Sequence, residues 1–92
     1  MDRLEKEIEN DCRKIAELHG CMLLKIVSPN RAGIPDRLFI GHGVMIWMEF
    51  KKPKSGRASA LQDRTLAKLR EMGHAAHLVD SVLVFELITG LK

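Results

Sequence analysis

The stretch "GIPDRLFIGHGVMIWMEFKKP", residues 33–53, decides the fold of this chain. Within it, two mostly apolar runs, residues 36–40 and 44–51, flank the segment "GHG". Glycines on both sides of one residue suit a tight turn between antiparallel strands, so we predict a β-hairpin. At the open end of this hairpin, where apolar side chains are expected, stand three charged residues: Asp36, Glu49 and Lys51. Their positions require an explanation other than packing.

The segments on either side of the hairpin complete the predicted element order. Residues 2–19 carry apolar side chains at every third or fourth position, Leu4 and Leu18 among them, and Gly20 follows, which predicts a helix. Four more elements are predicted from composition and turn residues: a strand at 21–27, a helix at 59–73, a strand at 75–80 and a short helix at 81–89. The crossover through the second helix should place the last strand parallel to a neighbour.

The length and composition of the chain indicate one small domain. A chain of 92 residues, 46% of them hydrophobic, can build only one core, so we expect a single α/β domain over residues 1–92. Much of its surface stays uncovered, which favours a homodimer. Charges interrupt the first apolar stretch, so no membrane span is expected. The spacing of Cys12 and Cys21 fits neither a metal site nor a redox pair, which indicates reduced thiols in a cytosolic protein.

The charged residues at the end of the hairpin suggest a metal site. Side chains alternate along a strand, so Glu49 and Lys51 share one face while Phe50 points to the other. The hairpin folds Asp36 back toward Glu49, and two close carboxylates repel unless a cation neutralises them. Asp36, Glu49 and the backbone carbonyl of Phe50 supply oxygen ligands of the kind that Mg²⁺ prefers. Lys51 could then hold or help to deprotonate a water and stabilise charge at a phosphoryl group.

Each of these features alone has a simpler interpretation. An acid two residues before a lysine at a strand end is commonly an exposed ion pair, and Asp after Pro is a frequent turn element. The combination of both with the glycine hairpin and a basic loop favours the metal site.

The basic loop "KKPKSGR", residues 51–57, follows the acidic strand end directly. An isolated basic run is usually a solvated loop, and the net charge of +3 is modest. The position beside Glu49 favours instead the docking of a polyanion. Five residues are expected to hold DNA phosphates without reading sequence: Lys52, Lys54, Arg57, Arg31 and Arg37.

Four segments carry a resemblance to a known group of nucleases: "EKEIE", "SPNRAGIPDRLFI", "MEFKKP" and "GRASALQDRTLAKLREMGHAAHLVD". Over nearly its whole length the chain resembles the stand-alone, phage-type VRR-NUC domains of the PD-(D/E)XK superfamily. The resemblance implies the αβββαβ core of the restriction-endonuclease-like fold with a mixed central sheet. It also implies metal-dependent cleavage of phosphodiester bonds, with Asp36, Glu49 and Lys51 as the catalytic trio.

Two further site residues follow from the same resemblance. The family uses a glutamate from the first helix, which matches Glu9 best and would bind the metal directly or through a water. Glu5, one turn earlier on the same side, stays open as the alternative, because helical spacing does not decide between them. A glutamine opens the second helix in the family, and Gln62 occupies that position.

These observations lead us to expect an Mg²⁺- or Mn²⁺-dependent endodeoxyribonuclease. By resemblance to Holliday junction resolvases, it would act as a homodimer on branched DNA, in the cytoplasm of a bacterium or a phage-infected host cell. One alternative is a nuclease that processes flaps or ends. The other is a DNA-binding module of the same fold without turnover, which the acidic pair argues against, because carboxylates beside a polyanion weaken binding unless a metal is present.

Overall fold

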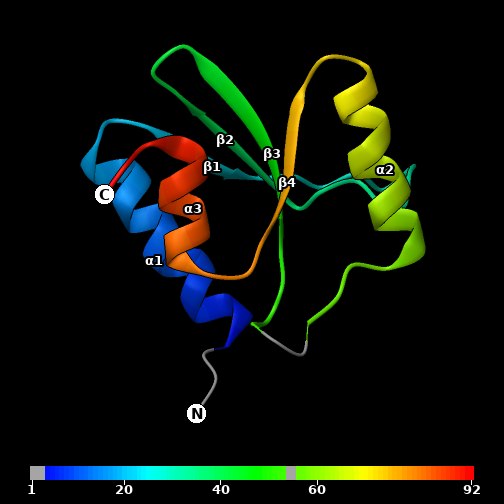
Figure 1. Ribbon diagram of the computed structural model, residues 1–92, viewed down its shortest axis with the longest axis horizontal. Coiled ribbons are helices and arrows are strands. Elements are labelled where there is room, and N and C mark those ends of the chain that lie inside the picture. The colour runs from blue at the N-terminus through cyan, green and yellow to red at the C-terminus, as the bar shows by residue number, and fades with distance from the viewer. Residues whose placement is uncertain (1–3, 54–55) are drawn as a thin grey trace.

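The computed structural model describes residues 4–53 and 56–92 and shows a small α/β domain (Figure 1). Its elements follow the predicted order helix, three strands, helix, strand, with a short helix at the end: α1 (Glu5–Leu18), β1 (Met22–Lys25), β2 (Arg37–Gly41), β3 (Val44–Phe50), α2 (Ala60–Glu71), β4 (Ala75–Val79) and α3 (Val82–Thr89). No helix within the described ranges is long and apolar enough to cross a membrane.

Several predicted element ends are wrong by a few residues, and two of these matter for the site. Asp36 lies just before β2 and Lys51 just after β3, although both were predicted inside strands. Their backbones nevertheless form hydrogen bonds with the chain segments next to them in the sheet. The Asp36 carbonyl accepts a hydrogen bond of 2.9 Å from the N–H of Ile26, and the Lys51 N–H donates one of 3.0 Å to the carbonyl of Val79. Both residues are therefore held in place at the end of the sheet.

The sheet has the strand order β1-β2-β3-β4 and is mixed, as expected. The pairs β1/β2 and β2/β3 are antiparallel, whereas β4 runs parallel to β3 after the crossover through α2. The hairpin turn consists of His42 and Gly43, with φ angles of 52° and 80°. Positive φ at both central residues matches the twist of the adjoining strands, so this turn fixes the hairpin register.

The core lies between the sheet and the two helices α1 and α3, which stand side by side, while α2 packs against β4 (Figure 1). On α1 the buried residues are Ile8, Cys12 and Ala16. The prediction that Leu4 and Leu18 belong to this stripe is wrong, since they are 60% and 80% exposed. Leu4 precedes the helix, and Leu18 lies about 200° around the helix axis from Ala16.

The loop of residues 28–36, which leads to Asp36, is packed against α2 at Gly33. The φ angle of Gly33 is +84°, and a Cβ atom there would lie 2.7 Å from Cγ of Leu61 and 3.1 Å from Oγ1 of Thr65. Only glycine combines this backbone conformation with so close an approach. Gly33 therefore holds the loop that carries Asp36 into the sheet.

We expect Gly33→Ala to lower the free energy of unfolding by about 1 kcal/mol more than Gly43→Ala does. Both glycines have positive φ, but nothing lies within 4 Å of a Cβ at Gly43, so this control isolates the contact with α2. Urea unfolding of the parent and both variants measures the difference. Equal losses for the two variants would show that the loop is not held by this contact.

Candidate active site

The hairpin register brings the two strand-end carboxylates together. Arg37 pairs with Met48, and the next step toward the open end sets Asp36 opposite Glu49. Residues directly opposite each other in an antiparallel pair point to the same side of the sheet. Glu49 is only 4% exposed. The two carboxylates are near enough for the charge of Asp36 to act on Glu49, and their role as a catalytic pair stays a prediction.

One oxygen of each carboxylate has no protein partner. Oδ1 of Asp36 and Oε1 of Glu49 are buried and accept no hydrogen bond from the described residues. Nζ of Lys51 lies 3.8 Å from Oε2 of Glu49. The backbone of Phe50 lowers the pKa of Asp36, and the backbone of Asp36 lowers the pKa of Glu49, but neither outweighs burial. A buried acceptor without a partner costs free energy, so these two oxygens call for a ligand.

Burial and mutual repulsion shift the protonation of this pair. Burial, followed by the charge of Asp36, raises the pKa of Glu49 from 4.5 to about 7, although Lys51 opposes this change. The pKa of Asp36 is also raised, first by burial and then by the charge of Glu9. The site therefore resists holding all its negative charge without a compensating cation.

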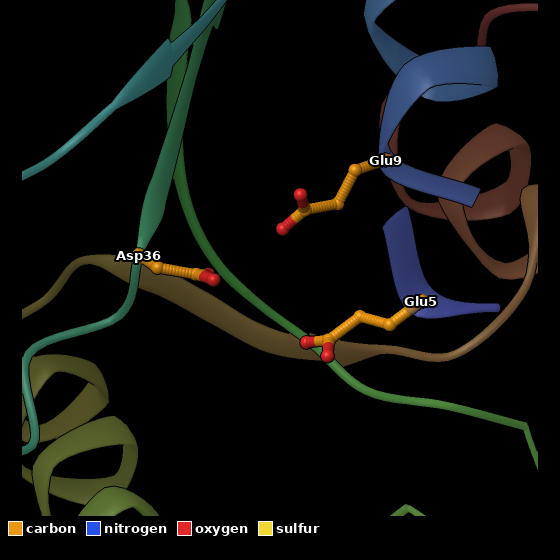
Figure 2. Close-up of side chains that lie close together, drawn as sticks. All are labelled: Glu5, Glu9 and Asp36. Carbon is orange, nitrogen blue, oxygen red and sulfur yellow. The ribbon is translucent and has the colours of Figure 1, made fainter. Parts of the chain in front are cut away.

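Two glutamates of α1 complete an acidic cluster with Asp36 (Figure 2). Carboxylate oxygens of Glu5, Glu9 and Asp36 lie within 4.8 Å of one another, and the three side chains point toward a common space. Glu5 and Glu9 are one helical turn apart, which places them on the same side of α1. The sequence left open whether Glu5 or Glu9 belongs to the site. In the structure both carboxylates lie close to Asp36, so either or both can take part.

Around this cluster is a polar hollow of about 360 Å³, lined by Glu5, Lys6, Glu9, Asn10, Lys25, Asp36 and Arg37. Arg37 was predicted to face DNA, but its Nη2 lies 3.3 Å from Oε2 of Glu9, and both side chains are less than one-fifth exposed. Sequence reasoning did not find Lys25. The signal was present, since Lys25 is the one charge within the apolar run 21–27.

The other residues predicted for the site lie around it in different settings. Gln62 and Ser59 cap the first turn of α2 with two reciprocal hydrogen bonds. Oε1 of Gln62 accepts from the backbone N–H of Ser59 at 2.8 Å, and the backbone N–H of Gln62 donates to Oγ of Ser59 at 3.1 Å. The side-chain nitrogen of Gln62, Nε2, is not used in this cap. Lys52, Arg57 and Arg31 are exposed, and Lys54 lies outside the described residues.

The donor set fits a hard divalent cation. Asp36 and Glu49 offer buried oxygens without partners, and Glu5 and Glu9 add carboxylates next to them. Mg²⁺ and Mn²⁺ prefer such oxygen ligands, whereas no histidine or cysteine takes part in the acidic cluster among the described residues. A cation held there would lie beside the Lys51 ammonium, an arrangement suited to stabilising negative charge at a phosphoryl group.

The chain is similar to known proteins, two of which are described here. A protein of Acyrthosiphon pisum secondary endosymbiont phage 1, named "Putative nuclease p44", is 37% identical over 81 residues, which are 87% of this chain and 82% of that protein. A solved structure named "VRR_NUC domain" matches with a TM-score of 0.83 at 23% sequence identity and covers 94% of both chains. No family model matches the chain. The solved structure supports the fold, and the phage protein indicates the family.

We expect the metal-free protein to become less stable as the pH rises from about 4.5 to about 7. In this window the unfolded chain has released the Glu49 proton while the folded protein still holds it, so raising the pH favours unfolding. The loss should be on the order of 1 to 3 kcal/mol. Urea unfolding in EDTA at several pH values measures it.

The variant Glu49→Gln should lose this part of the pH dependence, because its side chain does not titrate. Glu71→Gln, which changes an exposed glutamate of α2, should keep it. If Glu49→Gln followed the same pH profile as the parent, the burial of a titrating Glu49 would not account for the effect.

Proposed function

The chain belongs to the nuclease family of the phage relative and has the VRR-NUC fold, and we propose that it is a metal-dependent endodeoxyribonuclease. The resemblance drawn from the sequence is thereby confirmed. Support for the metal-dependent reaction comes above all from the two buried carboxylate oxygens without partners, Oδ1 of Asp36 and Oε1 of Glu49. Hydrolysis of a DNA phosphodiester bond is a reaction to which such an acidic site is suited.

Asp36, Glu49 and the backbone carbonyl of Phe50 would hold Mg²⁺ or Mn²⁺, with Glu9 or Glu5 contributing directly or through a water. When bound, the ion supplies a Lewis acid for the phosphoryl oxygen and an activated water as nucleophile. The protein provides the geometry, because the hairpin register fixes Asp36 and Glu49 face to face. Rigid placement of charged ligands before the substrate arrives is the main contribution of such a site.

Lys51 acts on the substrate side of the site. Its ammonium group, 3.8 Å from Oε2 of Glu49, orients the attacking water and stabilises the charge that develops at phosphorus. The side-chain nitrogen of Gln62, Nε2, donates a hydrogen bond to a phosphate or to this water. Phosphates further along the strand contact Lys52, Lys54 and Arg57, and Arg31 extends this cationic surface. Arg37 instead stays paired with Glu9 in the acidic cluster.

We infer that the active form is a homodimer that cleaves branched DNA, in the cytoplasm of a bacterium or of a phage-infected host cell. A two-fold axis places two identical active sites on opposite strands, which suits paired incision of a four-way junction. The exposed apolar side chains of this small domain also favour association: Leu18, Val27, Leu83 and Leu87, among others.

We expect Asp36→Asn to abolish cleavage while DNA binding is kept or becomes tighter. The substitution preserves the shape of the side chain but removes a charged metal ligand and a charge that repels DNA. Incubation with a labelled four-way junction, a flap and a linear duplex, each with and without Mn²⁺, measures cleavage. The same substrates separate a junction resolvase from a nuclease of flaps or ends.

Asp63→Asn is the matched control, because it removes an exposed carboxylate of α2 and should leave cleavage close to that of the parent. Metal-dependent cleavage by Asp36→Asn near the parent rate would falsify the assignment of the site. Binding of the junction without cleavage by the parent in Mn²⁺ would favour the non-catalytic module.

A further inference from the structure

A second hollowed surface lies between α2 and the loop of residues 28–36. Two neighbouring hollows there share the residues Arg31, Thr65 and Lys68 in their linings. One, of about 220 Å³, is completed by Leu61 and Arg64. The other, of about 250 Å³, is completed by three apolar residues: Ile34, Leu69 and Met72. We call these two hollows together the α2 groove.

All the charged residues of the α2 groove are cations. Arg31 comes from the loop, while Arg64 and Lys68 are one turn apart on the same side of α2. No described carboxylate lines either hollow, and none of these three cations forms an ion pair within residues 4–53 and 56–92. Three neighbouring positive charges without acidic partners attract a polyanion.

Packing contacts hold the two walls of the α2 groove at a fixed distance. Gly33 holds the loop against Leu61 and Thr65, so the distance between Arg31 and the helix is set by close packing. The side chain of Thr65 is anchored as well, since its hydroxyl donates a hydrogen bond of 2.9 Å to the carbonyl of Leu61. The backbone positions from which Arg31, Arg64 and Lys68 extend are therefore fixed relative to one another before a ligand binds.

We propose that the α2 groove binds the sugar–phosphate backbone of a DNA strand. A phosphate lies on Arg31, Arg64 and Lys68, and the apolar carbons of a deoxyribose pack against the nonpolar hollow beside them. This division of the ligand into a charged and an apolar part corresponds to the two halves of the groove. The inference rests on the proposed function, and it adds Arg64 and Lys68 to the residues that bind DNA.

The length of chain between Arg31 and Asp36 limits how far apart the α2 groove and the acidic cluster can lie. Arg31 precedes Asp36 by five residues, which span at most about 17 Å of chain. Along one DNA strand this length corresponds to about five nucleotides at 3.4 Å each. A strand seated in the α2 groove can therefore pass the acidic cluster within a few nucleotides, and the groove would help to set which phosphate is cleaved.

Salt-dependent binding tests the groove. We expect the double variant Arg64→Gln/Lys68→Gln to bind a linear duplex more weakly in Ca²⁺, with the slope of log affinity against log salt reduced by about 1 to 2. The control Arg13→Gln/Lys14→Gln removes the same charge from α1 and should change the slope by much less. Fluorescence anisotropy across a range of salt concentrations measures both, and equal slopes for the two double variants would refute the groove.

A second measurement uses the unmodified sequence. Acetylation of lysines, followed by mass spectrometry, should show that DNA protects Lys68 at least severalfold more than Lys14 in the same sample. Equal modification of both lysines with and without DNA would contradict the proposal. So would a change from dimer to monomer in sedimentation velocity caused by Arg64→Gln/Lys68→Gln, which would assign the groove to a second copy of the chain.

These outcomes are separate from the test of the nuclease site. If the two double variants have equal salt slopes and the parent protein cleaves DNA, only the proposal for the α2 groove is refuted. If DNA binding depends on Arg64 and Lys68 but the parent protein does not cleave DNA, the proposed nuclease activity is refuted and the proposal for the groove is supported.

Discussion

The register that sets Asp36 opposite Glu49 is the constraint on which the rest of this structure depends. It follows from a two-residue turn, His42 and Gly43, in which both φ angles are positive. A slip of one residue would move both carboxylates to other positions and expose the core side of the hairpin. The fold thus forces two acids together in a place where protein groups leave one oxygen of each without a partner.

The charges around this pair are only partly balanced. Arg37 contacts Glu9 and Lys51 contacts Glu49, so two cations in ion-pair contact face the four carboxylates of the site. Burial, followed by the charge of Asp36, raises the pKa of Glu49 to about 7, although Lys51 opposes this change. A divalent cation would remove this imbalance, and the exposed cations along the loop and α2 would attract the DNA.

Much of the fold and the centre of the site could be predicted from the sequence, because they depend on local patterns. The hairpin follows from "GHG" between apolar runs, and the face-to-face carboxylates follow from the hairpin. Contacts between distant segments could not be predicted. The Arg37–Glu9 ion pair joins β2 to α1, and the α2 groove depends on how Gly33 meets α2, which no periodicity encodes. Helical spacing likewise could not show that Glu5 and Glu9 both reach Asp36.

The most direct measurement of the central claim is calorimetric titration of Ca²⁺ into the DNA-free protein at pH 8, where Glu49 is ionised. The parent and the control Glu71→Gln should bind Ca²⁺ with the same affinity, and Glu49→Gln should bind at least tenfold more weakly, because it lacks one charged ligand. Equal affinity in all three proteins, or no binding by the parent at millimolar Ca²⁺, would contradict the account of a cation site built on Asp36 and Glu49.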